Sequence, residues 1–302
     1  MPSFRAAPVR VRVPATSANL GPGFDCAGLA LSLHDDVVVR IADGGLSVDV
    51  AGEGADTLRR TERHLVVSSL RAAFDRLGGQ PRGLEVVCAN RIPQSRGLGS
   101  SSAAIVAALV AARGLVLGGE ELLDDDGVLA LATELEGHPD NVAACLRGGL
   151  TLAWTGPDGV RAVRRDVHPD LLPVAFVPAT RSSTRTVRGL LPVAVPHTEA
   201  AANAARAALL PLALTQDPTL AHAATEDHLH QRYRASAMPR TAALVEALRA
   251  DGLPAVVSGA GPSVLVLARR GQSAAVLARA ARGWTATAYE VDARGAQLLR
   301  VG

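Results

Sequence analysis

The segment from Arg91 to Ala104 reads Arg-Ile-Pro-Gln-Ser-Arg-Gly-Leu-Gly-Ser-Ser-Ser-Ala-Ala, and an apolar run follows it directly. It is a glycine- and serine-rich loop that opens into a helix. Gly97 and Gly99 allow a tight turn and a close approach of the backbone to a ligand. The first amides of a helix lack partners within it, and its positive end favours an anion. The segment therefore indicates a phosphate site, or alternatively a serine-capped helix after a flexible loop.

Phosphate binding in this chain would have to proceed without lysine. All 31 basic residues are arginine, which excludes the P-loop motif with its phosphate-contacting lysine. Backbone amides, the three loop serines and Arg96 remain as the groups that could hold a phosphate. They are the candidate donors.

The composition is that of a globular protein and excludes several kinds of partner. The 302 residues are 48% apolar and 20% charged, with a net charge of only +2 and 3% aromatic residues. These values argue against nucleic acid and an anionic membrane as partners. The longest apolar helical run, Ala103–Ala112, is too short to span a bilayer, and the N-terminus lacks a signal-peptide core. Three widely spaced cysteines indicate a reducing compartment and no zinc site. We therefore expect a cytoplasmic protein.

Strands and helices alternate without a strict βαβ rhythm, which favours an α+β fold. A stretch rich in Gly, Pro and charge at Gly156–Pro173 indicates a domain boundary near residue 160. The expected strands are Val9–Val13 (ended by Pro14), Asp36–Ile41, Leu46–Val50, Leu84–Ala89, Leu150–Trp154, Val174–Val177, Ala255–Ser258, Val264–Ala268, Thr285–Val291 and Gln297–Val301. The expected helices are His64–Leu77, Ser101–Leu117, Gly127–Glu136, Asp140–Cys145, Ser182–Leu190, Thr198–Leu214, Thr219–Ser236, Arg240–Ala250 and Ser273–Ala281.

Two further segments are rich in turn residues. Pro14–Asp25 reads Pro-Ala-Thr-Ser-Ala-Asn-Leu-Gly-Pro-Gly-Phe-Asp and follows the first predicted strand. Ser258–Ser263 reads Ser-Gly-Ala-Gly-Pro-Ser and separates two apolar strands. Taken singly, the first is typical of a tight connection with an Asx turn, and the second is typical of a simple hairpin.

Taken together and in this order, these segments resemble the GHMP small-molecule kinases, and within that superfamily the homoserine kinases. The resemblance rests on Val13–Leu31, Arg91–Ala108, His138–Gly149 and Ser258–Leu267, with weaker matches at Thr184–Pro192 and Asp227–Pro239. It therefore covers most of the chain.

The resemblance implies the fold and the reaction. An N-terminal α+β domain of the ribosomal-protein-S5-domain-2-like type is expected over residues 1–160, and a C-terminal ferredoxin-like α/β sandwich over residues 161–302. ATP and substrate would occupy the cleft between them. The implied reaction moves the γ-phosphoryl group of ATP to the side-chain hydroxyl of L-homoserine, on the route to threonine. A homodimer is also implied.

The resemblance assigns the nucleotide and Mg²⁺ to particular residues. The expected ATP-binding residues are Pro93, Arg96, Gly97, Leu98, Gly99, Ser100, Ser101 and Ser102. Ser101 and Glu134 would hold Mg²⁺, which requires hard oxygen ligands. Glu136 is an alternative to Glu134, because the segment before Asp140 is shorter here than in some relatives. The adenine pocket has only candidate segments, around Leu65–Leu70 and Val86–Arg91.

The resemblance also places the acceptor substrate. Asp140 either accepts the hydroxyl proton or only orients the substrate, in which case the proton passes directly to phosphate. Asn141 is expected to hydrogen-bond the substrate, His138 to contact the substrate or the loop, and Thr184 to lie near the transferred group.

The two charged ends of homoserine require groups of opposite charge in the site. Asn19 and Asp25 match positions that meet the amino group. Arg188 and Arg234 match positions that hold the carboxylate. Gly259 is expected to close the site from the C-terminal domain.

Other readings remain open at this point. One is a GHMP kinase with a mevalonate-like or sugar substrate, and another is a non-catalytic relative that binds ligand without turnover. The missing lysine argues against a mevalonate-type kinase, and a galactokinase-type signature is absent. The presence of Glu134, Asp140 and all three loop serines argues against a non-catalytic relative.

Overall fold

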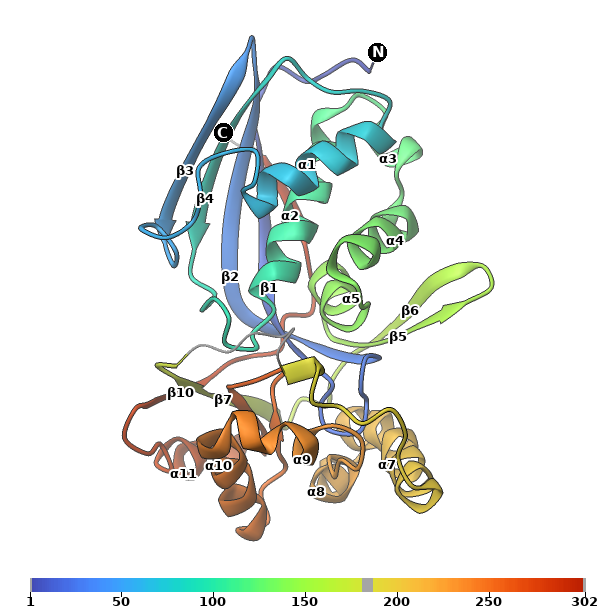
Figure 1. Cartoon of the computed structure of the whole chain (residues 1–302), viewed down its shortest axis with the longest axis vertical. Helices are drawn as coiled ribbons and strands as arrows, with labels where there is room; N and C mark the ends of the chain where they lie inside the picture. The colour runs from blue at the N-terminus through green and yellow to red at the C-terminus, as the bar shows by residue number, and fades with distance from the viewer. Residues whose placement is uncertain (1, 181–186, 301–302) are drawn as a thin grey trace.

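The computed structural model describes residues 2–180 and 187–300, and two β-sheets lie one beyond the other along the long axis (Figure 1). Within these residues the first sheet has seven strands, five of which follow the order β11-β1-β2-β4-β3. Strand β5 pairs with β2 and with β6, and among the described strands of this sheet only the β3–β4 pair is parallel. The strands are β1 (Val9–Ala18), β2 (Ala27–Ala42), β3 (Gly45–Gly52), β4 (Gly83–Asn90), β5 (Leu150–Gly156), β6 (Gly159–Arg165) and β11 (Gln297–Arg300).

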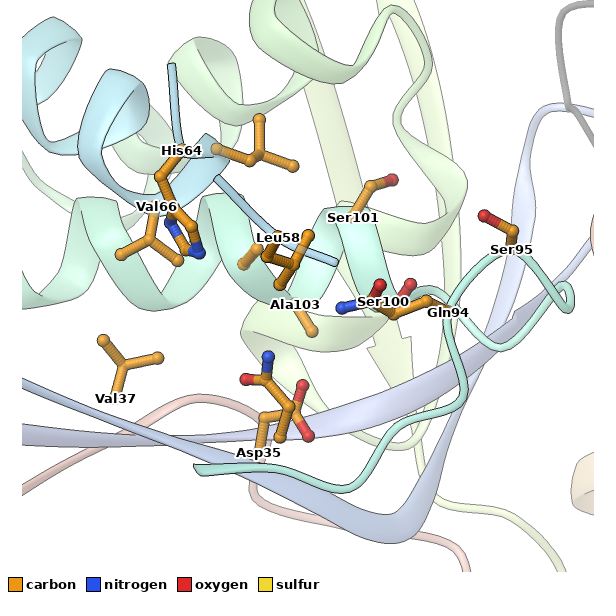
Figure 2. Close-up of a pocket in the computed structure, with 13 residues that line it drawn as sticks. Asp35, Val37, Leu58, His64, Val66, Gln94, Ser95, Ser100, Ser101 and Ala103 are labelled. Atoms are coloured by element: carbon orange, nitrogen blue, oxygen red, sulfur yellow. The ribbon is translucent and has the colours of Figure 1, made fainter. Parts of the chain in front are cut away.

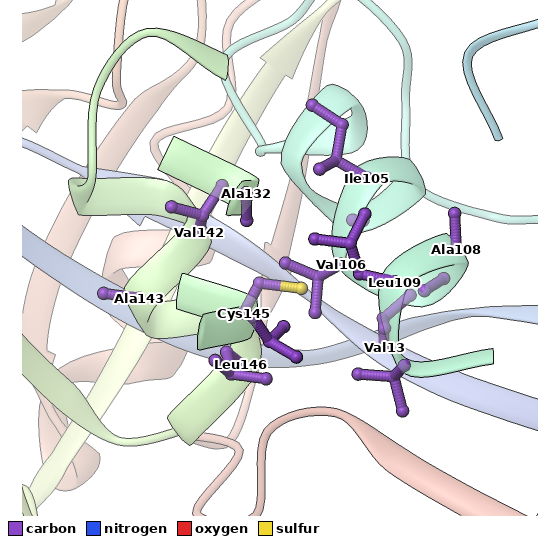
Figure 3. Packing of buried hydrophobic residues seen from close by; sticks show 14 of the residues in the cluster. Val13, Ile105, Val106, Ala108, Leu109, Ala132, Val142, Ala143, Cys145 and Leu146 are labelled. Carbon is purple, nitrogen blue, oxygen red and sulfur yellow. The ribbon is translucent and has the colours of Figure 1, made fainter. Parts of the chain in front are cut away.

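Five helices lie on one side of the first sheet (Figure 1). They are α1 (Leu65–Arg76), α2 (Ser100–Leu115), α3 (Gly119–Leu122), α4 (Asp125–Glu136) and α5 (Asp140–Arg147). Helices α2 and α5 contact the central strands of the sheet, and α1 and α3 pack on α2. Helix α2 is apolar on nearly every side, so it is buried at the centre of this layer. Figure 3 shows Val106 and Leu109 of α2 beside Val13 of β1 and Cys145 of α5. This packing fixes the position of the α2 N-terminus.

The second sheet is antiparallel and has the order β10-β7-β9-β8. Its strands are β7 (Leu171–Pro178), β8 (Ala255–Val257), β9 (Val264–Arg269) and β10 (Trp284–Ala288). The longer helices of this part are α7 (His197–Thr215) and α10 (Pro239–Ala250), and the shorter ones are α8 (Ala221–Ala224), α9 (Gln231–Arg234) and α11 (Ser273–Leu277). Val174, Phe176, Val264 and Val266 form its core together with Leu248 of α10.

The C-terminal tail connects the two sheets. The Tyr289 amide donates to the Pro173 carbonyl of β7 at 2.9 Å, and the Asp292 amide donates to the Ala30 carbonyl of β2 at 3.1 Å. Strand β11 then pairs with β1 in the first sheet. The boundary expected at residue 160 falls within β6, and the last strand of the expected C-terminal domain lies in the first sheet.

The prediction that the first strand ends at Pro14 is wrong. Strand β1 continues to Ala18, and its pairing with β2 shifts register between Pro14 and Ala15. Proline cannot donate to a ladder, but it is tolerated at such a bulge. The extension carries Thr16 and Ser17 to the glycine loop.

The single helix predicted over Thr219–Ser236 is also wrong, because the segment contains only short turns and helices. The Asp227 carboxylate accepts hydrogen bonds from the amides of Leu229, His230 and Gln231. Such side-chain bonds compete with helical ones. Similarly, strand β6 lies where a Gly/Pro-rich linker was expected, since residues 156–159 form a tight hairpin turn.

Most other predicted elements are confirmed within a few residues, among them α1, α2, α4, α5, β3 and β4. The helix expected at Ser182–Leu190 falls largely outside the described residues.

Cys88 and Cys145 are buried free thiols, and burial raises the pKa of Cys88 to about 12. No helix in the described part of the chain combines the length and apolar character needed to cross a membrane.

Candidate active site

The glycine loop adopts a backbone that its glycines permit. Gly97 has φ +76° and Gly99 has φ +70°, in the left-handed region that side chains rarely adopt. Gly99 is the N-cap of α2, and no side chain caps that helix end. Leu98 between them is 1% exposed and anchors the loop in the core. The amides at the start of α2 are therefore available to an anion.

The loop is held against the other two glycine-containing segments. A Cβ on Gly97 would lie 2.3 Å from the Ser258 carbonyl oxygen, and one on Gly99 would lie 1.9 Å from Thr16 Oγ1. The Ser258 hydroxyl lies 2.6 Å from the Gly97 carbonyl oxygen and 2.8 Å from Ser17 Oγ. The three segments singled out from the sequence therefore meet at one place.

Arg96 fastens the loop to the second sheet. Its guanidinium donates to the carbonyls of Pro178 at 2.9 Å, Ala179 at 3.0 Å and Gln94 at 3.2 Å. Pro93 and Arg96 also line a cavity of about 400 Å³ formed with the ends of β7 and β10. Three of the N–H donors of Arg96 are therefore engaged by backbone carbonyl groups.

Of the two glutamates considered for Mg²⁺, only Glu136 faces the loop. Glu136 Oε1 accepts from the hydroxyls of Ser101 at 2.5 Å and Ser102 at 2.9 Å. Glu134 is exposed and makes no side-chain hydrogen bond or ion pair with any described residue. A carboxylate and a serine hydroxyl are hard oxygen ligands, so Glu136 and Ser101 fit a Mg²⁺ ion that takes its remaining ligands from phosphate and water.

Asp140 begins α5 and is 2% exposed. Its Oδ1 accepts from the Asn141 amide at 2.7 Å and lies 3.1 Å from His138 Nδ1. The hydrogen bond to Asp140 raises the pKa of His138. Asn141 Oδ1 accepts from Thr16 Oγ1 at 2.7 Å, which ties α5 to β1 beside the loop.

The Pro14–Asp25 segment contains a strained turn. Asn19, Leu20 and Asp25 have φ values of +69°, +49° and +56°, and strain of this kind is concentrated at functional sites. The Asn19 side chain donates to the Gly259 carbonyl at 2.9 Å and accepts from the Asp25 amide at 3.0 Å. Arg188 pairs with Asp25 in a fork, with N–O distances of 2.9 and 2.5 Å.

Arg234 is the last residue of α9, and its guanidinium lies close to the Phe24 ring. Its guanidinium is 5.2 Å from the Phe24 ring centroid, and that of Arg188 is 5.4 Å from it. Arg234 is 2% exposed, and its Nε has no hydrogen-bond partner among the described residues. Burial and the nearby Arg188 lower its pKa, while Asp25 and Asp140 act in the opposite sense. A buried cation with an unused donor fits an incoming carboxylate.

A second cavity adjoins the loop (Figure 2). It has a volume of about 190 Å³, and Ser100 and Ser101 form part of its wall. Leu65, Val66 and Asn90 also line it, and they belong to the two candidate adenine segments. Asp35 and His64 also contribute polar groups to the wall. Neither was identified from the sequence as a site residue, because single residues on separate elements leave no local pattern.

The structure thus brings nearly all of the expected site residues together. One connected region contains the glycine loop and the residues Asn19, Asp25, Glu136, His138, Asp140, Asn141, Arg188, Arg234 and Gly259. Glu134 is exposed and makes no side-chain hydrogen bond or ion pair with this region among the described residues, and Thr184 lies outside the described residues. Thr16 and Phe24 also belong to this region, and neither was predicted as a site residue, although both lie in the segment Pro14–Asp25.

Comparison with known proteins first gives the class. Residues 64–149 match the family model of the GHMP kinases N terminal domain, and residues 205–286 match that of the GHMP kinases C terminal. The first match contains the glycine loop, and the second contains Arg234 and Gly259. The fold and the two matched domains are those of a GHMP-type kinase.

Curated relatives identify the family to which the chain belongs within the GHMP kinases. A homoserine kinase of Streptomyces avermitilis is 63% identical over 99% of this chain and 98% of its own length. One of Clavibacter michiganensis is 50% identical over 95% of this chain and 92% of its own. The solved structure of a putative homoserine kinase from Listeria monocytogenes superposes with a TM-score of 0.78 at 31% identity, covering 97% of this chain and all of that one. The chain therefore belongs to the homoserine kinase family of the GHMP kinases.

Proposed function

We propose that this protein transfers the γ-phosphoryl group of ATP to the side-chain hydroxyl of L-homoserine, giving ADP and O-phospho-L-homoserine. The observation that carries the proposal is the meeting of an uncapped helix N-terminus with a buried carboxylate and two arginines, in a chain 63% identical to a homoserine kinase. A cytoplasmic step in threonine synthesis is part of the same proposal.

ATP would bind with its phosphates on the amides from Gly97 to Ser102. The left-handed glycines expose these amides, and the positive end of α2 favours the triphosphate. Arg96 would keep the loop closed against β7 through its three backbone bonds. The nucleoside would enter the 190 Å³ cavity, because Ser100 and Ser101 belong to both the loop and the cavity wall.

Glu136 and Ser101 would hold Mg²⁺ at the phosphate-binding loop. Bound there, Mg²⁺ would neutralise charge on the phosphate oxygens during transfer. Glu136 is preferred over Glu134 in this proposal because its carboxylate contacts the hydroxyls of Ser101 and Ser102.

Homoserine would bind between the Pro14–Asp25 turn and α9. Its carboxylate would meet the unused Nε donor of Arg234 and the guanidinium of Arg188. Its ammonium group would meet Asp25, which already pairs with Arg188. Asn19 would act through Asp25, since both ends of its amide are engaged within the protein.

Asp140 would contact the reacting hydroxyl. Its Oδ1 is fixed by the Asn141 amide and His138, which leaves Oδ2 for the substrate. In the transfer, the homoserine oxygen forms a bond to the γ-phosphorus while the bond to the leaving ADP oxygen breaks. The hydroxyl proton passes to the Asp140 carboxylate as the new bond forms, because an aspartate is basic enough only at that stage.

Measurement of ADP formation tests the proposal. Purified protein with ATP and Mg²⁺ is assayed with L-homoserine, mevalonate and galactose as separate acceptors, and phosphorus NMR identifies the product. We expect turnover with homoserine and a phosphomonoester product. Turnover with mevalonate or the sugar but not with homoserine would contradict the assignment of homoserine as the substrate. Nucleotide binding without turnover of any acceptor would contradict the assignment of kinase activity.

A further inference from the structure

The cavity beside the glycine loop contains a histidine whose ring makes no hydrogen bond. His64 is 5% exposed, and neither Nδ1 nor Nε2 has a partner among the described residues. It occupies the N-cap position of α1 without capping that helix. Figure 2 shows its ring directed into the space that Asp35 faces from the opposite wall. Buried polar atoms without partners are rare, so a buried ring directed into a cavity with both nitrogens unpaired points to ligand binding there.

Burial determines the form in which His64 meets a ligand. It lowers the pKa of the imidazole, so the neutral ring is favoured at neutral pH. A neutral imidazole has one N–H donor and one acceptor nitrogen. His64 can therefore donate one hydrogen bond into the cavity.

Asp35 supplies an acceptor that its surroundings hold in place. Its Oδ1 accepts from the amides of Arg91 at 2.6 Å and Ile92 at 2.9 Å, and the residue is 7% exposed. Oδ2 receives no hydrogen bond from the part of the chain that the structure describes. Burial raises the pKa of Asp35, while the bonds from the Arg91 and Ile92 amides act in the opposite sense. These two bonds fix the carboxylate, so in its ionised form Oδ2 is an acceptor in the cavity wall.

We propose that Asp35 and His64 select the nucleobase, with Asp35 Oδ2 accepting from the 6-amino group of adenine and the His64 ring donating to an adjacent ring nitrogen. This inference rests on the proposed function, since it assigns the cavity to the base of ATP. It makes the two side chains residues that determine nucleotide specificity, separate from the loop that holds the phosphates.

The pairing distinguishes adenine from guanine by the group at position 6. Adenine presents an amine there, which matches the acceptor of Asp35. Guanine presents a carbonyl oxygen, which would face a carboxylate oxygen with no proton between them. A site whose polar groups are left unpaired by the wrong base disfavours that base strongly.

Asp35→Asn is the decisive variant. The asparagine oxygen retains the bonds from Arg91 and Ile92, while its amino group replaces the Oδ2 acceptor with a donor. We measure kcat and KM for ATP and for GTP at saturating homoserine, and the affinity for a non-hydrolysable ATP analogue by calorimetry. We expect the preference for ATP over GTP to fall by about tenfold or more, mainly through KM. Asp49→Asn, on exposed residue Asp49 of β3, is the matched control and should leave the ratio unchanged.

His64→Leu separates base recognition from a structural role. Leucine fills the same space without polar atoms, so the protein without nucleotide should unfold at the same or a higher temperature. We expect weaker binding of the ATP analogue by about tenfold, with kcat nearly retained. The proposal is overturned by an unchanged ATP:GTP ratio in Asp35→Asn, or by unchanged analogue affinity in His64→Leu, when the wild type phosphorylates homoserine. A wild type without homoserine-dependent turnover would instead contradict the proposed function, and the calorimetry would still test the base site.

Discussion

Asp140 combines deep burial with two fixed hydrogen bonds on one of its oxygens. If its free oxygen accepts the homoserine proton, Asp140→Asn should lower kcat by about a hundredfold while changing the KM for ATP little. The asparagine oxygen can still accept the Asn141 amide bond, so the local fold should persist. Steady-state kinetics decide the role, and a loss of less than about tenfold would leave Asp140 only an orienting one.

Arg234 offers a test of the carboxylate assignment. Arg234→Lys keeps the positive charge but removes the fork and the unpaired Nε. We expect the KM for homoserine to rise by about tenfold or more, with a much smaller change for ATP. Arg232→Lys, at the neighbouring exposed arginine, is the control. Equal effects of Arg234→Lys on both substrates would reject the assignment.

Glu136 and Glu134 form a matched pair for the Mg²⁺ site. Glu136→Gln removes the carboxylate that contacts Ser101 and Ser102, whereas Glu134→Gln changes an exposed side chain. We expect the Mg²⁺ concentration needed for half-maximal activity to rise by about tenfold in the first variant and to stay constant in the second. A raised Mg²⁺ requirement in Glu134→Gln but not in Glu136→Gln would assign the metal to Glu134 instead.

The sequence could predict which residues belong to the site better than which way their side chains face. Glu134 and Glu136 are about 200° apart around a helix with 3.6 residues per turn, so only one of them can face α2. Which one does so depends on the packing of α4, and no local pattern records it. Asp35 and His64 escaped prediction for a related reason, since the cavity they share forms only when β2 and α1 come together.

At the level of elements, prediction succeeded where periodicity and glycine boundaries agreed, as in α1 and α2. It failed where a tertiary contact overrode a local signal. The bulge at Pro14 allows β1 to continue to Ala18 because β2 supplies partners on the far side of the proline. The Asp227 side chain breaks the expected helix because its carboxylate binds three successive amides. Both exceptions lie beside the site, where local rules are most often broken.

The glycine loop packs closely against the Ser258–Ser263 turn, and Gly97→Ala tests whether this packing is needed for stability and for ATP binding. A Cβ there would meet the Ser258 carbonyl oxygen at 2.3 Å, and the φ of +76° is unfavourable for alanine. We expect the free energy of unfolding to fall by about 1–3 kcal/mol and the KM for ATP to rise by about tenfold or more. Denaturant titration and kinetics measure these effects. Gly271→Ala, where a Cβ would have no neighbour within 4 Å, should change neither.

At the scale of the whole molecule, the two sheets form one site because three connections hold them together. They are the Arg96 bonds to the end of β7, the contact between Gly97 and Ser258, and the C-terminal tail. The composition change near residue 160 predicted a two-part chain but not the return of residues 297–300 to the first sheet. A four-residue strand at the end of a chain has too little pattern to reveal its partner.

Asp292 is one attachment of that tail, and its contribution to stability should depend on pH. Its Oδ2 lies 2.6 Å from His34 Nε2, and its Oδ1 accepts from the amides of Arg294 and Gly295. Burial alone would raise the pKa of Asp292, but the hydrogen bonds from His34 and the two amides outweigh it and leave the pKa below its ordinary value of 3.8. Because the folded-state pKa is depressed, the stabilisation is complete above pH 3.8 and is lost as the pH falls through the lower folded-state value.

Asp292→Asn should therefore lower the free energy of unfolding by about 1–3 kcal/mol at pH 7. The difference from wild type should shrink as the pH falls below 3.8, because the wild-type carboxyl then becomes neutral as well. Urea titrations of both proteins between pH 7 and pH 3 measure this convergence, and Asp166→Asn, at an exposed carboxylate, controls for general acid effects. A difference that stays constant with pH would show that Asp292 acts through its shape and not its charge.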